Sequence, residues 1–185
     1  MKKKILWITQ TAALLALLVV LQYLTKPMGQ LVTGTCVNTV LAVAALFGGL
    51  GCGLTVALCS PVLAYLLGIA PQVLTVPAIM VGNCVYVVLL ALIAGKKFEK
   101  NFKTVLRMLG AWLAAALGKF AALYSIVNWL ICGLFAKDLL EAGIMKAPML
   151  KMLPATFGWM QLVTALIGGG IALLIAPVLK KALQK

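Results

Sequence analysis

Long apolar stretches constrain this chain more than any other feature of its sequence. Glycines, prolines and charged residues divide it into six such stretches, at about 5–24, 31–47, 50–68, 74–95, 104–131 and 156–179. A helix needs about 20 apolar residues to cross a bilayer. Hydrophobic residues make up 64% of the chain and charged residues 10%, compared with roughly half and a quarter in soluble domains. We therefore predict an all-α integral membrane protein, a single domain over residues 1–185 built as a bundle of six transmembrane helices.

The basic residues indicate how the bundle is oriented. With six spans and a cytoplasmic N-terminus, eleven of the 16 Lys and Arg residues flank spans on the inner side: Lys2, Lys3, Lys4, Lys96, Lys97, Lys100, Lys103, Arg107, Lys180, Lys181 and Lys185. Four lie on the outer side: Lys26, Lys137, Lys146 and Lys151. Basic residues accumulate on the cytoplasmic side of membrane proteins. We predict that both termini are cytoplasmic, and the net charge of +13 then calls for no nucleic-acid partner.

The third outer connection, residues 132–154, is the longest. Its "LFAKDLLEAG" portion is amphipathic, which predicts a short helix lying at the outer membrane interface. Gly143 would end that helix, because glycine readily adopts the conformation that follows a helix C-terminus.

Several kinds of chemistry are excluded by residues that the chain lacks. It has no histidine, and its three acidic residues, Glu99, Asp138 and Glu141, all fall between spans. Histidine triads, carboxylate proton relays and the usual zinc sites therefore cannot be built. No P-loop motif is present, so ATP hydrolysis would have to occur in partner subunits. We predict a protein that is not an enzyme and that holds no metal or cofactor.

Lys119 lies near the middle of the apolar stretch 104–131. A charge at that depth costs on the order of 3 kcal/mol, and no span supplies a carboxylate to offset the cost. Three explanations follow: the lysine is neutral at rest, faces a watery cavity, or awaits a negatively charged ligand. A fourth is purely structural, with the lysine donating hydrogen bonds to backbone carbonyls.

Other polar and aromatic side chains gather in the predicted outer halves of the spans. They are Asn38, Tyr65, Asn83, Tyr86, Trp159 and Gln161. Taken singly, such residues often belong to interfacial belts or to contacts between helices. Together with Lys119 they predict a substrate pocket in which amides orient a small molecule and aromatic rings cover it.

Small residues four apart allow close helix contacts in lipid. Ala12 and Ala16 form such a face on the first predicted helix. This face suits either internal packing or docking of a partner, and spacing alone does not distinguish the two. The fifth and sixth spans carry small residues as well, in the series Ala114, Gly118 and Ala122 and at Gly168–Gly170.

The whole pattern resembles the substrate-binding S components of energy-coupling factor (ECF) vitamin transporters. The likeness covers essentially the full chain: its size, six spans, the basic inner connection and "AALLA" in the first span. It extends to "SPVLAYLLG", "VPAIMVGN" and "FGWMQLVTALIGG" in the later spans.

The resemblance implies a function and partners. S components bind a vitamin or related micronutrient from the outside and associate with a transmembrane T subunit and two cytoplasmic ATPase subunits, as part of an ABC importer. Ala12 and Ala16 would then meet the T subunit, and Lys119, Asn83 and Gln161 would face the ligand. We expect a multi-pass protein of a bacterial plasma membrane whose substrate is a small carboxylate.

Two other functions fit the same sequence. A small structural or assembly subunit would use its polar residues only to lock helices together, and a stand-alone facilitator would need no ATPase. A ligand that co-purifies with the protein separates a binding protein from a scaffold. Recovery of a T subunit separates an S component from a facilitator.

Overall fold

The computed structural model describes residues 2–69, 72–95 and 101–183, except the side chains of residues 2, 3, 177 and 180–183. Within these ranges the chain is helical and contains no strand. The first half comprises α1 (Lys2–Thr25), η1 (Lys26–Met28), α2 (Gln30–Val43), η2 (Ala44–Gly48), α3 (Gly49–Leu66) and α4 (Thr75–Ala94). The second half comprises α5 (Phe102–Leu123), η3 (Tyr124–Leu134), α6 (Ala136–Glu141), α7 (Ala147–Phe157) and α8 (Trp159–Leu183). The all-α prediction is confirmed.

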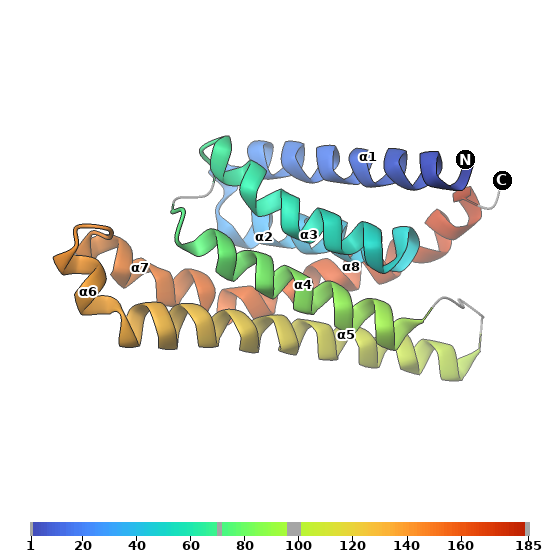
Figure 1. Cartoon of the computed structure of the whole chain (residues 1–185). Coiled ribbons are helices and arrows are strands. Elements are labelled where there is room, and N and C mark those ends of the chain that lie inside the picture. The colour runs from blue at the N-terminus through green and yellow to red at the C-terminus, as the bar shows by residue number, and fades with distance from the viewer. Residues whose placement is uncertain (1, 70–71, 96–100, 184–185) are drawn as a thin grey trace.

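The helices lie alongside one another in a bundle (Figure 1). The start of α1 and the end of α8 lie at one end of the bundle, together with the end of α4 and the start of α5, whereas α6 and α7 lie at the other end. This arrangement agrees with a basic connection on the same side as both termini. Residues 96–100, which hold part of that connection, lie outside the described residues, and the cytoplasmic location of this side stays a prediction.

Five helical stretches of the described chain are long and apolar enough to cross a membrane: Lys4–Met28, Gln30–Leu66, Thr75–Ala94, Phe102–Leu134 and Trp159–Ala176. The predicted number was six. The difference lies in Gln30–Leu66, which has 37 residues and contains both predicted spans 31–47 and 50–68. The count of six spans stays a prediction.

The chain turns back inside this 37-residue stretch. Gly49 has a φ of +82°, a conformation that suits glycine because it has no Cβ. A Cβ added to Gly53 would lie 3.2 Å from the Cα of Ala45, although eight residues of straight helix span about 12 Å. α2 with η2 and α3 are therefore two separate helices joined by a tight turn.

The region after η3 contains more helix than the sequence indicated. The predicted short helix before Gly143 is confirmed as α6, and Gly143 has a φ of +66°. α7 was not predicted, and the last long helix begins at Trp159 rather than near residue 156. Pro148 lies in the first turn of α7, where a missing N–H costs no helical hydrogen bond.

Pro154 lies inside α7, where proline cannot donate to the carbonyl four residues earlier. That carbonyl belongs to Leu150, and it accepts a hydrogen bond of 3.8 Å from Cys132 Sγ. A side chain of η3 thus meets the carbonyl that proline leaves free. This contact helps to hold α7 against η3.

Glycines bring α2 and α8 close together. A Cβ on Gly34 would lie 2.9 Å from Thr164 Cγ2, and one on Gly168 would lie 2.6 Å from the carbonyl oxygen of Thr35. Real Cβ atoms essentially never approach neighbours so closely. The close contact that small residues allow in membranes therefore joins the helices that carry Asn38 and Gln161.

We predict that Gly168→Ala destabilises the protein by about 1–3 kcal/mol, the usual range for overpacking, because its methyl group would push α8 away from α2. The matched control is Gly110→Ala in α5, where an added Cβ meets nothing within 4 Å and alanine is the better helix former. Unfolding of the purified protein in detergent measures both variants. Equal stability of the two would contradict the close contact.

Candidate functional site

A cavity of about 270 Å³ opens among the helices. In the first half of the chain, its lining comes from the last turns of α1, from η1, from the first half of α2, from the C-terminal part of α3 and from the start of α4. In the second half, it comes from α7, from the start of α8 and from Lys119, which lies in α5. It lies toward the end of the bundle that holds α7, away from both termini (Figure 1). The described lining includes two lysines and no acidic residue.

Lys119 lies at this cavity, and its side chain is 2% exposed. Its Nζ donates hydrogen bonds of 2.6 Å to Asn38 Oδ1 and 2.7 Å to Asn83 Oδ1. All three side chains line the cavity. The structure therefore brings together three of the residues that the sequence singled out, from α5, α2 and α4.

The partners of Lys119 differ from those considered in the sequence analysis. They are neither backbone carbonyls nor carboxylates but two amide side chains. An amide oxygen carries a partial negative charge and accepts strongly from a cationic donor. Two such acceptors offset part of the cost of burying an ammonium without any acid in the bundle.

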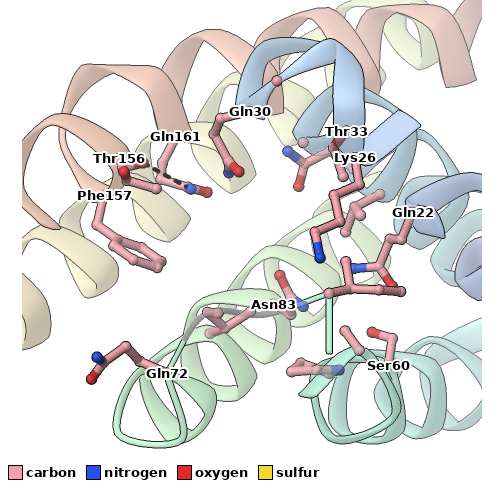
Figure 2. A pocket seen from close by; sticks show the side chains of 18 of the residues that line it. Gln22, Lys26, Gln30, Thr33, Ser60, Gln72, Asn83, Thr156, Phe157 and Gln161 are labelled. Atoms are coloured by element: carbon pink, nitrogen blue, oxygen red, sulfur yellow. Dashed lines mark hydrogen bonds between the residues drawn. The ribbon is translucent and has the colours of Figure 1, made fainter. Parts of the chain in front are cut away.

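The polar contacts continue into α8. Asn38 Nδ2 donates to Thr164 Oγ1 at 3.2 Å, and Thr164 Oγ1 donates to the carbonyl of Gln161 at 3.2 Å. We call Lys119, Asn38, Asn83 and Thr164 the polar cluster. Gln161 also lines the cavity, and its Nε2 donates to the carbonyl of Thr156 at 3.1 Å (Figure 2).

Tyr86 lies next to the polar cluster but does not line the cavity. Its side chain is fully buried, and its hydroxyl donates to the carbonyl of Ala165 at 3.4 Å. Lys119 Nζ lies 5.6 Å from the centre of its ring, within the range of a cation–π interaction. Tyr86 thus supports the lysine from the side.

Two other predicted aromatic residues lie outside the cavity lining. Trp159 is 74% exposed, and its ring stacks on Phe120 with centroids 5.5 Å apart. Tyr65 is 40% exposed. Both occupy outward faces of their helices, and neither belongs to the group around Lys119. That they cover a ligand stays a prediction.

The sequence analysis missed much of the lining. The missed polar residues are Gln22, Lys26, Gln30, Thr33, Ser60, Gln72 and Thr156, and Phe157 adds an aromatic ring (Figure 2). Most lie near the ends of helices on the side of α7, where the turn from one helix to the next brings them together. Polar residues at the ends of the predicted spans were the available signal, but polar residues are common at span ends.

Lys26 extends across the connection between helices. Its Nζ donates a 2.6 Å hydrogen bond to the carbonyl of Gly68. η1, after α1, is thereby tied to the end of α3 beside the cavity.

Three buried side-chain atoms of residues that line the cavity have no hydrogen-bond partner in the described chain. They are Asn83 Nδ2, Gln22 Oε1 and Ser60 Oγ. Buried polar groups are ordinarily paired, so these atoms mark positions where a bound molecule or water would form hydrogen bonds.

Ala12 and Ala16 are both exposed on α1. α1 packs on α2 and α3 and lies along one edge of the bundle (Figure 1). The face that these alanines form is therefore open to the surroundings of the described chain and does not serve its internal packing.

We predict that Asn38→Leu destabilises the protein by about 1.5–3 kcal/mol, the range for a hydrogen bond to a charged group, since Lys119 loses an acceptor. Adding Lys119→Met in the same variant should restore part of the stability, because removing both partners of a buried polar pair costs less than removing one. Unfolding in detergent tests the pair. Additive losses would show that the contact does not stabilise the fold.

No group of three or more His, Cys, Asp or Glu side chains in the described chain is placed to hold a metal ion.

Comparison with known proteins identifies a family. The model for "ECF transporter, substrate-specific component" matches residues 7–180. No curated protein and no solved structure matches the chain.

Members of this family are membrane-embedded, substrate-binding subunits rather than catalytic ones, and they associate with T and ATPase subunits. The helices long enough to cross a membrane agree with this description. Because the match spans nearly the whole length of the chain, the protein belongs to the family of substrate-specific components of ECF transporters.

Proposed function

We propose that this protein is the S component of a bacterial ECF importer in the plasma membrane, and that it captures a small vitamin-like organic anion from the outside. The observation that carries the anionic character is Lys119, a basic side chain 2% exposed at a cavity whose described lining has no acid. Both termini would face the cytoplasm, and the cavity would then lie toward the outer side.

The donors around Lys119 favour an acceptor-rich ligand. An ammonium has three N–H donors, and Asn38 and Asn83 accept two of them. Asn83 Nδ2 beside it has no partner among the described residues. A carboxylate or phosphate meeting both donors would supply the negative charge that the bundle lacks, and the low local dielectric would strengthen the pair.

The remaining lining suits the body of such a ligand. Phe157, Leu153 and Ile79 present apolar surface, and amides and hydroxyls lie around them. A mostly apolar pocket with a few convergent polar groups is typical of small-molecule sites. Tyr65 and Trp159, if they contact the ligand as predicted, would do so only after a rearrangement of their helices.

A purely structural subunit is disfavoured by the cavity. A protein that used its polar residues only to lock helices would have no need of three unpaired polar atoms on residues that line one cavity. A stand-alone facilitator is disfavoured by α1, whose exposed Ala12 and Ala16 offer a smooth face for another helix. We propose that this face binds the T subunit.

Tryptophan at both Ala12 and Ala16 should abolish recovery of the T and ATPase subunits while leaving small-molecule binding nearly intact, since bulk would separate a close helix contact. Co-purification from cells that express all subunits measures this. The matched control places tryptophan at Leu113 and Leu117, which are also exposed and four residues apart on α5. Equal recovery with both variants would contradict docking through α1.

Lys119→Met should weaken binding of the natural substrate by about 2–5 kcal/mol, the range for breaking a buried charge pair. Mass spectrometry of extracts from the purified protein identifies the substrate and measures how much each variant retains. Lys119→Gln keeps a donor for the asparagine oxygens without the charge, so it separates loss of charge from loss of packing.

Lys103→Met, at an exposed site near the start of α5, serves as the control. Full retention by Lys119→Gln and Lys119→Met, or a cationic substrate, would refute an anion site at Lys119. It would leave the family assignment untouched.

A further inference from the structure

The three unpaired atoms at the cavity come from three different helices. Asn83 Nδ2 belongs to α4, Gln22 Oε1 to α1 and Ser60 Oγ to α3. Ser60 is 1% exposed and Asn83 is fully buried. Within a bilayer, an unpaired polar atom finds no surrounding water to pair with. Their convergence on one cavity indicates that they serve whatever fills it.

These atoms differ in what they need from a ligand. Asn83 Oδ1 accepts from Lys119, so its unpaired nitrogen must donate, and it belongs with the anion site. A serine hydroxyl both donates and accepts, and a glutamine amide offers an acceptor and donors. Gln22 and Ser60 are therefore matched by a group that donates and accepts, such as a hydroxyl, rather than by a second anion.

Gln22 and Ser60 lie apart from the aromatic part of the lining. Figure 2 shows Gln22 and Ser60 on one side, Phe157 and Gln161 on the opposite side, and Asn83 between them. An apolar body against Phe157 would leave Gln22 and Ser60 facing a different edge of the molecule.

Building on the proposed function, we infer that the substrate is bifunctional. It carries an anionic group that meets Lys119 and Asn83, and a separate hydroxyl or N–H group that meets Gln22 and Ser60. An apolar part of the same molecule lies against Phe157. Simple carboxylates with a purely apolar chain are poor substrates, because they would bury against Gln22 and Ser60 and leave both unpaired.

Two matched series of probes test this inference on the full chain, purified in detergent and shown by mass spectrometry to be free of ligand. The first series contains straight-chain carboxylates of about four to eight carbons, and the second contains the same acids with a terminal hydroxyl. Thermal-shift titration gives an apparent Kd for each. At least one hydroxy acid should bind about tenfold or more tightly than its parent acid, as expected when a polar site finds its partner.

Ser60→Ala and Gln22→Leu should lower this preference for the hydroxy acid without lowering the thermal stability of the empty protein, since each removes an unpaired group. The matched controls are Ser125→Ala, at an exposed serine of η3, and Gln10→Leu, three turns earlier in α1. Neither residue lines the cavity, and both controls should keep the preference of the parent protein.

Each other outcome overturns the inference in a distinct way. Equal binding of acids and hydroxy acids refutes the second polar group but supports the anion site. An equal loss of both series in Ser60→Ala and Gln22→Leu would show that these residues only shape the cavity. Binding of no member of either series refutes the inference, whereas the family role is judged separately by recovery of the T subunit.

Discussion

The hydrogen bonds from Lys119 to Asn38 and Asn83 are the interaction on which the rest of the bundle depends. They join α5 to α2 and α4, and the bond from Asn38 to Thr164 adds α8. A lysine buried in lipid needs acceptors that no single helix can provide. The lysine is therefore stabilised only when these four helices have assembled in the correct register, which links the folding of the bundle to the formation of its site.

Close helix packing makes these bonds possible. Gly168 allows α8 to approach the backbone of α2 next to Asn38, and Gly34 allows α2 to approach Thr164. Larger side chains at either position would move Asn38 away from its partners, and a hydrogen bond weakens within a few tenths of an ångström. The glycines and the polar cluster thus work as one unit, in which packing sets the geometry and the polar contacts select one arrangement.

Sequence reasoning recovered the all-α class, the short helix α6 and three residues of the polar cluster, Lys119, Asn38 and Asn83, because hydropathy and an isolated lysine are strong local signals. It missed α7, whose proline-containing sequence reads as a connection, and it missed Gln22 and Ser60. Those residues become neighbours only through the turn at Gly49 and the packing of α1 on α3, which are long-range features. Trp159 is the opposite case, a residue that was predicted for the site but lies outside the cavity lining. Its chemistry suited a pocket, but α8 begins at this residue and the ring stacks on Phe120.

The peripheral position of α1 has a consequence for how such a protein can diverge. The polar cluster draws its side chains from α2, α4, α5 and α8, whereas Ala12 and Ala16 lie on α1, which packs mainly on α2 and α3 among the long helices. α1 contributes Gln22 to the cavity lining, but Ala12 and Ala16 do not belong to that lining. Substitutions at sites without shared partners usually have independent effects. Mutations of the polar cluster that retune what the cavity accepts therefore leave the outer face of α1 unchanged, so new ligands can be acquired during evolution without altering the surface available to other subunits.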